Sequence, residues 1–336
     1  MKNMAGYPTE AHDVATDGLG CFIFSLDMEL AWGYYDKFVP GLFSPDGSRE
    51  REAVRRLLSL FDEYEIPATW AVVGQLFYRS HKEAAFNPAE DWKGKYPLFE
   101  RMYYENHPLL FAPDILEMLL TSKIRQEIGF HGHTHKVFDE ETMSPERAKS
   151  EIQAWKDAAK PVNIEPKTVI FPRSRVGYFN LFRQSGFTCY RGLERYPAKV
   201  YYLPVVGRFF RRFHYYLTAV TFPSRYSAEV DPSGLVNLRF SRWLFGFNRR
   251  LEVWLDRFNL HTLRLQTLVQ GVRKVAEEKK IPHVFAHPCE FKTEMDFQKL
   301  RFLLCHVANE VQKGGMVSTS MEQMAEKVKS ISREQP

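Results

Sequence analysis

Cysteine is scarce in this sequence. The four cysteines lie far apart, and no two of them form a Cys-x-x-Cys pair: Cys21, Cys189, Cys289 and Cys305. A disulfide framework needs more cysteines at closer spacing, and a cysteine zinc site needs them in near pairs. The sequence therefore argues against both.

Long hydrophobic runs are missing as well. No stretch approaches the roughly 18 to 20 apolar residues that a membrane-spanning helix needs. Residues 1–18 contain Glu10, Asp13 and Asp17 and lack an apolar centre, so they do not have the pattern of a signal peptide. We expect a flexible leader over residues 1–18 and a location in the cytoplasm.

The chain has no strong excess of charge of either sign. A net charge of +5 over 336 residues is too small to indicate nucleic acid, so no nucleic-acid partner is expected. Hydrophobic residues make up 44% and charged residues 26%, as in a globular protein with a full core. Because no repeat, low-complexity tract or linker stands out, we predict one domain over residues 19–330.

Strand and helix patterns alternate along most of the chain. Nearly continuous apolar runs, typical of strands buried on both faces, are followed by segments with apolar residues at helical spacing. The predicted strands are 21–26, 66–74, 126–130, 168–171, 188–190, 235–241, 283–286 and 314–318. The predicted helices are 49–65, 114–125, 144–159, 179–185, 262–280, 297–311 and 320–328. Short connections favour right-handed parallel crossovers, and the pattern predicts an α/β fold like a (β/α) barrel.

Residues 195–232 interrupt this alternation and form a predicted insertion. Within it, residues 200–222 mix aromatic side chains with Arg208, Arg211 and Arg212. A basic, aromatic segment of this kind can be a lid, a groove wall or a surface for peripheral membrane contact. A helical insertion that covers the barrel would have the same composition, so the role of residues 200–222 stays open.

Reactive side chains gather at the ends of the predicted strands. They are two carboxylates after the first strand, three imidazoles after the third, an arginine after the fourth and an imidazole after a late strand: Asp27, Glu29, His131, His133, His135, Arg173 and His287. In a parallel barrel these ends lie on one face. Imidazole is the commonest protein ligand for transition metals. Two histidines and one carboxylate suit zinc or another divalent metal with a position open to water, and the dense cluster favours His131 and His135.

A structural role would also account for several of these side chains. Asp27 and Glu29 could begin a helix, as an N-cap residue and a first-turn acid. His133 could be a loop histidine bonded to the backbone, His287 a satisfied core histidine, and Arg173 a partner in a surface salt bridge. We interpret the other histidines that we considered as structural: His214, His261, His283 and His306.

Taken in order, five segments resemble the polysaccharide deacetylases of the NodB-homology type (carbohydrate esterase family four). They are Phe24–Glu29, Pro67–Gly74, Glu127–His135, Phe171–Arg173 and His287–Pro288, and they span nearly the whole chain. Each is a weak motif alone, whereas five in the family's order are fairly specific. The resemblance implies a distorted (β/α) barrel of about seven parallel strands that removes an N-acetyl or other N-acyl group from a sugar.

The resemblance also implies a role for each matching residue. Asp27 matches the catalytic base, His287 the catalytic acid and Arg173 the arginine that orients the base. His131 and His135 match the two histidine ligands of an H-x-x-x-H motif, with zinc as the expected divalent metal.

The first motif departs from the commonest family pattern, which has two adjacent aspartates. Here Met28 separates Asp27 from Glu29, which is similar to an atypical Asp-x-Glu branch. We therefore assign the third metal ligand to Glu29 and keep Asp27 as the alternative ligand. The same departure supports a different hypothesis, a non-catalytic carbohydrate-binding relative.

A different pairing of histidines would resemble another family. If His131 and His133 were the ligands, the H-x-H pair would resemble an amidohydrolase, a metal-dependent C–N hydrolase acting on a small molecule. That family places its pair on the first strand, whereas this pair follows about the third, so the order favours a deacetylase. The expected partner is an N-acylated saccharide, either a nucleotide sugar or a lipid-linked glycan, and no sequence pattern indicates an oligomeric state.

Overall fold

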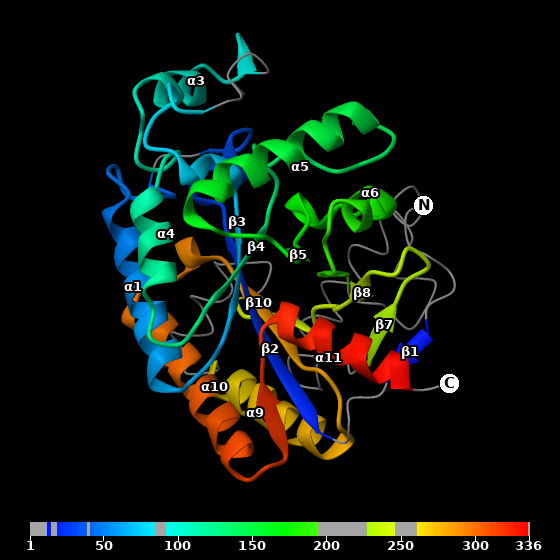
Figure 1. Cartoon of the computed structure of the whole chain (residues 1–336). Helices are drawn as coiled ribbons and strands as arrows, with labels where there is room; N and C mark the ends of the chain where they lie inside the picture. The colour runs from blue at the N-terminus through cyan, green and yellow to red at the C-terminus, as the bar shows by residue number, and fades with distance from the viewer. Residues whose placement is uncertain are drawn as a thin grey trace, which may run out of the picture.

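A curled, mostly parallel sheet forms the centre of the protein, as a computed structural model shows (Figure 1). The structure describes residues 12–14, 19–38, 41–84, 92–193, 227–245 and 261–334. Across the sheet the strands are β1 (His12–Val14), β7 (Ala228–Val230), β8 (Val236–Asn237), β6 (Cys189–Tyr190), β5 (Thr168–Val169), β4 (Glu127–Phe130), β3 (Thr69–Val72), β2 (Gly20–Met28), β10 (His283–Ala286) and β9 (Arg242–Trp243), while β11 (Met316–Ser318) pairs with β2.

The order of the strands confirms the predicted fold class. From β8 to β9 every neighbouring pair is parallel, and β11 is also parallel to β2. The pairs of β1 with β7 and of β7 with β8 are antiparallel. The result is a half-barrel of the distorted (β/α) type, with the carboxyl ends of the parallel strands on one face.

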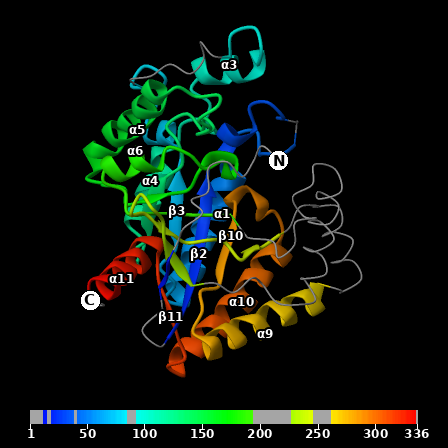
Figure 2. The same cartoon turned by 90° about the vertical axis from the view of Figure 1, so that its right-hand side faces the viewer.

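Helices lie on both sides of this sheet. They are α1 (Ser48–Glu63), α3 (Pro97–Tyr104), α4 (Pro113–Leu120), α5 (Pro145–Ala159), α6 (Phe179–Gln184), α9 (His261–Glu278) and α10 (Glu294–Gln312), followed by α11 (Met321–Glu334). Figure 2 shows β2 and β10 in the middle, with α9 and α10 on one side and α11 on the other. Among the described residues, no helix combines the length and the apolar character needed to cross a membrane.

Strand β2 divides its side chains between two cores. Phe22, Phe24 and Leu26 belong to a large cluster with the outer helices. Cys21 and Ile23 point to the inner face and pack in a smaller cluster that includes residues of α11. Because side chains alternate along a strand, Ser25 and Asp27 continue the inner-face series toward the carboxyl end. The inner face is therefore apolar near α11 and polar at the opposite end.

The clearest local signals in the sequence are reproduced. The predicted helix start at Ser144 is the N-cap of α5, where the Ser144 hydroxyl accepts a hydrogen bond from the backbone N–H of Arg147 and Pro145 occupies the first turn. The long predicted strand at 235–241 is reduced to β8, and the predicted loop at 79–108 contains α3.

Three short strands were not predicted. Strands β1, β7 and β9 have two or three residues each, too few for a periodic pattern, and they exist because a neighbouring strand offers hydrogen bonds. Residues 12–14 of the predicted flexible leader form β1 and pair with β7. Most of the predicted insertion, including the segment 200–222, lies outside the described residues.

Candidate metal centre

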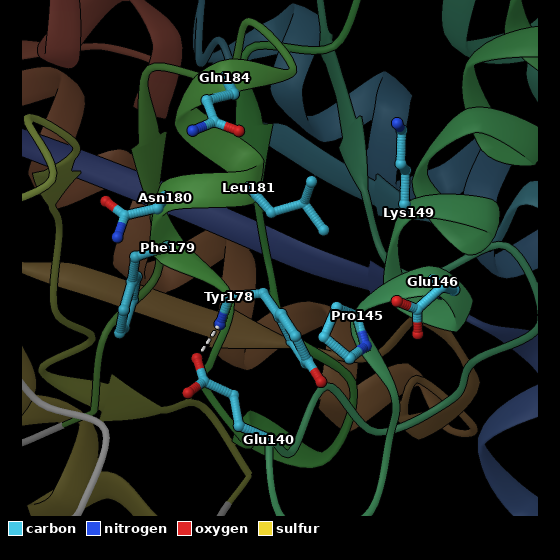
Figure 3. Close-up of a pocket in the computed structure, with 9 residues that line it drawn as sticks. All are labelled: Glu140, Pro145, Glu146, Lys149, Tyr178, Phe179, Asn180, Leu181 and Gln184. Atoms are coloured by element: carbon cyan, nitrogen blue, oxygen red, sulfur yellow. Dashed lines mark hydrogen bonds between the residues drawn. The ribbon is translucent and has the colours of Figure 1, made fainter.

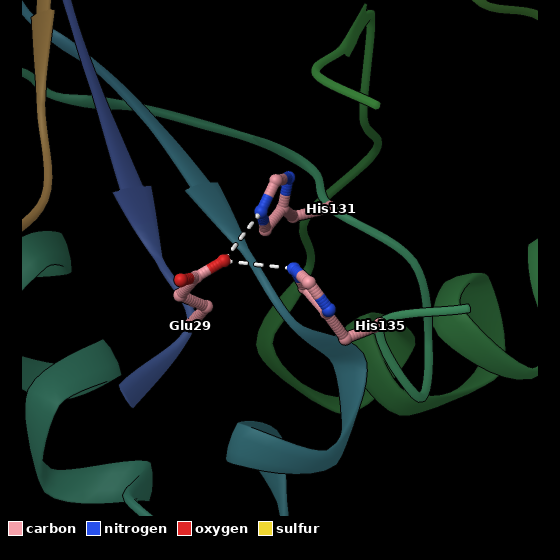
Figure 4. A group of neighbouring side chains, drawn as sticks. All are labelled: Glu29, His131 and His135. Carbon is pink, nitrogen blue, oxygen red and sulfur yellow. Dashed lines mark hydrogen bonds and ion pairs between the residues drawn. The ribbon is translucent and has the colours of Figure 1, made fainter. Parts of the chain in front are cut away.

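Three buried side chains converge beyond the carboxyl ends of β2 and β4. Figure 4 shows the Glu29 carboxylate facing the rings of His131 and His135. Oxygen Oε2 of Glu29 lies 3.2 Å from Nε2 of His131 and 2.7 Å from Nε2 of His135. Among the described residues, this is the group whose ligand-type atoms all lie within 4.8 Å of one another.

The hydrogen bond on the far side of the His131 ring fixes its tautomer. Nitrogen Nδ1 lies 2.7 Å from the carbonyl oxygen of Ile170, so it carries the proton and donates. In the neutral ring, Nε2 then presents a lone pair toward the Glu29 carboxylate. Two acceptors face each other, which is favourable only with a cation between them.

The His135 ring gives the same indication. It is 1% exposed, Nε2 faces the Glu29 carboxylate at 2.7 Å, and Nδ1 has no hydrogen-bond partner among the described residues. Burial lowers the pKa of His135 against the opposing effect of Glu29, so the ring stays neutral and can coordinate. Burial alone would raise the pKa of Glu29, but His135 and His131 hold it well below its usual value. One carboxylate with two imidazole nitrogens is a donor set that fits a divalent metal such as zinc.

The backbone of the His131–His135 loop is tightly constrained. Gly132 and His135 have φ angles of 75° and 57°, in the left-handed region. The N–H of Gly74, at the start of η2 (Gly74–Phe77), donates to the Gly132 carbonyl at 2.9 Å. A Cβ on Gly74 would lie 2.5 Å from Nδ1 of His133, so glycine is required for this close approach.

Glycine also makes room for the third ligand. Glu29 begins the short 3-10 helix η1 (Leu30–Tyr34) and makes no side-chain capping bond, so the helix-start alternative does not account for it. A Cβ on Gly33 would lie 2.2 Å from Oε1 of Glu29. The absence of a side chain at Gly33 therefore lets the carboxylate turn toward the histidines.

Asp27 lies beside this group in a bidentate ion pair with Arg191. The guanidinium donates to Oδ1 at 2.6 Å and to Oδ2 at 2.7 Å, and both side chains are buried. Burial alone would raise the pKa of Asp27, but Arg191, His131 and His287 lower it. Because both Asp27 oxygens are held by Arg191, and Oδ2 is 4.0 Å from His131, the geometry favours Glu29 over Asp27 as the third ligand.

A chain of hydrogen bonds through Ser25 and His283 holds Arg191 in place. Arg191 donates to the Ser25 hydroxyl at 3.1 Å, so that hydroxyl is left to donate to Nε2 of His283 at 2.8 Å. Nδ1 of His283 then donates to the carbonyl of Leu238 at 3.2 Å. Burial, followed by the charge of Arg191, lowers the pKa of His283 to about 3, so the ring is neutral and acts as a structural acceptor, as predicted.

His287 faces both carboxylates from the end of β10. Its Nε2 lies 3.8 Å from Oδ2 of Asp27 and 3.9 Å from Oε1 of Glu29. On the other side, Nδ1 lies 3.2 Å from Glu290, which also accepts from Trp243 at 3.0 Å. Burial alone would lower the pKa of His287, but Glu290, Glu29 and Asp27 raise it to about 10. The imidazole is therefore protonated at neutral pH.

Arg173 lies elsewhere than expected. Its guanidinium pairs with Asp36 at 2.6 and 2.8 Å and lies 5.3 Å from the Tyr35 ring. Arg173 and Ser174 have φ angles of 54° and 53° in η4 (Pro172–Ser174), so the chain leaves the strand direction before Arg173. The contact with Asp27 that we predicted for Arg173 is made by Arg191, and the alternative of a salt bridge describes Arg173 better.

Arg191 is the functional candidate that the sequence reasoning missed. It follows β6, which was predicted, and it shares the inner face with Cys189 by strand alternation. Extending the alternation of the predicted strand at 188–190 by one residue places Arg191 on the same face as Cys189, so the sequence did contain a signal for it.

His133 does not join the metal group. Its Nε2 lies 3.0 Å from the side-chain nitrogen of Gln75, and burial lowers its pKa to about 3. The converging pair is His131 with His135, which disfavours the H-x-H arrangement of an amidohydrolase.

A separate cavity of about 590 Å³ lies between α5 and α6 (Figure 3). Its apolar part comes from Pro145, Tyr178, Phe179 and Leu181, and Glu140 is one of the charged residues at its edge. It is lined by none of the residues of the metal group, so we do not assign it to the candidate centre.

The family model for polysaccharide deacetylase matches residues 42–180. The matched segment contains His131 and His135, whereas Asp27, Glu29 and His287 lie outside it. No curated protein matches the sequence significantly.

Similar solved structures align with almost the whole chain. A Mycobacterium smegmatis protein described as a polysaccharide deacetylase has a TM-score of 0.54 at 15% identity, over 98% of this chain and 96% of its own. An allantoinase has a TM-score of 0.49 at 13% identity, over 92% and 90%. A Pseudomonas aeruginosa PAO1 protein described as a polysaccharide deacetylase has 0.48 at 11%, over 92% and 90%. At such identities the likeness concerns the fold alone, and only the first is close enough to support it.

Proposed function

We propose that the chain is a polysaccharide deacetylase, as the family model matching residues 42–180 suggests. In this proposal it hydrolyses the N-acetyl, or another N-acyl, group of a saccharide at the centre of Glu29, His131 and His135. One observation carries the proposal. A buried carboxylate and two imidazole nitrogens converge beside a second carboxylate, Asp27, and a protonated imidazole, His287. That is the set of groups that metal-assisted amide hydrolysis requires.

Glu29, His131 and His135 would hold a divalent cation, for which we propose zinc because two imidazoles and one carboxylate are a common catalytic zinc set. Such a cation supplies two effects, a lowered pKa for water and a polarised amide carbonyl.

Asp27 serves as the base in this proposal. The attacking water gives its proton to Asp27 as its oxygen bonds to the carbonyl carbon of the N-acyl group. Arg191 supports this role because its bidentate pair holds the carboxylate in one orientation and keeps it ionised. Asp27 is 5% exposed, so few other waters compete for it.

His287 serves as the acid. It transfers the proton on Nε2 to the departing nitrogen as the C–N bond breaks, which releases a carboxylic acid and an amino sugar. Glu290 supports this role because it anchors the other ring nitrogen and turns Nε2 toward Asp27 and Glu29.

We assign Arg173 to contact with the saccharide. Its side chain is 31% exposed, it is paired with Asp36 and it lies near Tyr35, a combination of charged and aromatic groups suited to sugar hydroxyls and ring faces. Within the class of N-acylated saccharides, a nucleotide sugar and a lipid-linked glycan are the two forms to test first.

The test is release of acetate or formate from a panel of N-acylated sugars, nucleotide sugars, lipid-linked glycans and small-molecule amides. The zinc-loaded protein should act on at least one saccharide, and Asp27→Asn should lower kcat by at least about 100-fold. Purified protein should bind about one divalent ion per chain and lose it in His131→Ala. Hydrolysis of small amides but of no saccharide would contradict the proposal, and so would full activity in Asp27→Asn.

A further inference from the structure

A buried carboxylate outside the predicted site contacts the metal-binding loop from helix α5. Glu151 is 2% exposed. Its Oε2 accepts the backbone N–H groups of His133 at 3.0 Å and Thr134 at 2.9 Å. Its Oε1 accepts the Thr134 hydroxyl at 2.6 Å. One side chain thus holds His133 and Thr134, two of the three residues between His131 and His135.

Three other backbone groups of this loop form hydrogen bonds with β3 and the segment that follows it. The N–H of His131 donates to the carbonyl of Val72 at 3.2 Å. The carbonyls of Gly132 and His133 accept from Gly74 at 2.9 Å and Gln75 at 3.0 Å. The loop is therefore fixed on one side by β3 and η2 and on the other by Glu151, because buried backbone groups need partners.

Helix α5 is itself held in place close to Glu151. Trp155, one helical turn later, donates from Nε1 to the carbonyl of Val72 at 2.7 Å. Arg147, one turn earlier, lies 3.4 Å from Oε1 of Glu151. These three residues follow one another at i, i+4 and i+8, so they form one stripe of the helix that faces the loop and the end of β3.

A carboxylate in this position is costly for stability alone. Burial raises the pKa of Glu151, although the hydrogen bonds from Thr134 oppose the effect. An apolar side chain would avoid that cost but would leave two N–H groups without an acceptor. The loop also contains a left-handed φ angle of 57° at His135, which a non-glycine residue keeps only where the surroundings over-determine the backbone.

We propose that Glu151 is a positioning residue of the metal centre, which sets the spacing of the His131 and His135 nitrogens by fixing the backbone between them. The inference rests on the proposed function in one respect, that a metal binds at Glu29, His131 and His135. It predicts that variants of Glu151 that still fold have a lower affinity for the metal.

The test is the affinity for Zn²⁺ alone, measured by competition with a chromogenic chelator, in the full chain. Glu151→Ala should weaken binding by about 10- to 100-fold, the range for groups that orient metal ligands. Glu151→Gln keeps one acceptor oxygen and should retain most of the affinity. Thr134→Val removes one of the three hydrogen bonds and should fall between the parent and Glu151→Ala.

Asp157→Ala is the matched control, since Asp157 is an exposed acid on the same helix whose partner is Gln153. Its affinity should equal that of the parent. Visible absorption of Co²⁺ bound in place of zinc adds a readout of ligand geometry, which should change in Glu151→Ala.

The outcomes separate the two proposals. Parent protein that binds no Zn²⁺ would overturn the metal centre itself. Parent and Glu151→Ala with affinities within twofold would overturn the positioning role alone. If Glu151→Ala does not fold, Glu151→Gln and Thr134→Val decide: parent-like affinity in Thr134→Val would then count against the role.

Discussion

At the scale of single residues, the candidate site depends on where side chains are absent as much as on where they are present. Glycine at position 33 leaves space that the Glu29 carboxylate fills, and glycine at position 74 allows η2 to approach His133. Gly33 thus leaves room for a proposed ligand, and Gly74 lets η2 donate a hydrogen bond to the loop that carries the two histidine ligands.

Gly33→Ala should therefore disable the metal centre without unfolding the protein. The three atoms nearest to the added Cβ all belong to the Glu29 carboxylate, so the ligand rather than the backbone should move. We expect at least about a 10-fold loss of zinc affinity, measured by chelator competition. Gly315→Ala is the control, because its nearest neighbours lie 3.8 Å away. Equal zinc affinity in Gly33→Ala and the parent would show that Glu29 is not a ligand.

The two arginines allow a direct comparison. Arg191→Lys should lower kcat by about 100-fold, because lysine cannot replace the bidentate pair that orients Asp27. Arg173→Lys should mainly raise KM, because Arg173 is partly exposed, pairs with Asp36 and is proposed to contact the saccharide. Arg191→Met should also destabilise the fold by about 3 to 5 kcal/mol, since Asp27 would stay buried without a partner. A larger loss of kcat in Arg173→Lys than in Arg191→Lys would reverse the assignment.

At the scale of the element, the inner-face side chains of β2 and β10 become more polar toward the carboxyl end of each strand. In β2 this series runs from Cys21 and Ile23 to Ser25 and Asp27, and in β10 the inner residues His283 and Phe285 lead to His287. Ser25 and His283 form a polar layer between the apolar residues near α11 and the charged residues at the carboxyl ends of the strands. A neutral His283 is essential to this layer, because a second positive charge would face Arg191.

This makes stability dependent on pH. The pKa of His283 is about 3 in the folded protein against about 6.5 when unfolded, so the unfolded chain binds more protons between these values. The free energy of unfolding should thus decrease as pH falls from about 6.5 toward 3, by up to about 1.4 kcal/mol per pH unit. Urea unfolding at pH 7, 6 and 5 with a chelator present measures the slope.

His283→Gln should reduce that slope, and the partly exposed His306→Gln should leave it unchanged. A slope identical in parent and His283→Gln would mean that the ring is protonated in the folded protein, against the hydrogen bond from Ser25.

Strand periodicity explains how much the sequence could reveal. The long apolar runs and amphipathic helices identified the elements that carry Asp27, Glu29, His131, His135 and His287, because burial on both faces leaves a clear pattern. Arg173 was misplaced because left-handed angles at the end of β5 are not visible in a motif. The acceptor role of Glu151 could not be seen either, since it depends on how α5 packs against η2.

At the scale of the whole molecule, metal binding and folding should be coupled. The three ligands come from the ends of β2 and β4, so the binding site exists only when the sheet is assembled. A ligand that binds only the folded state stabilises it by about 2.7 kcal/mol when its concentration is 100 times Kd.

Removal of metal should consequently lower the melting temperature. Chelator-treated protein should melt a few degrees below the zinc-loaded protein at saturating zinc, and readdition of zinc should restore the difference. His131→Ala should melt at one temperature with or without zinc. A zinc-dependent shift of equal size in His131→Ala would place the stabilising ion elsewhere.

Helix α11 covers the inner face of the half-barrel at the end opposite the metal group. Its apolar side chains pack against Cys21 and Ile23 of β2: Met321, Met324, Ala325 and Val328. Under the proposed function, a saccharide would therefore approach from the carboxyl ends of the strands and not from the α11 end. In that arrangement an acyl group within a saccharide chain, as well as one at its end, could reach Asp27.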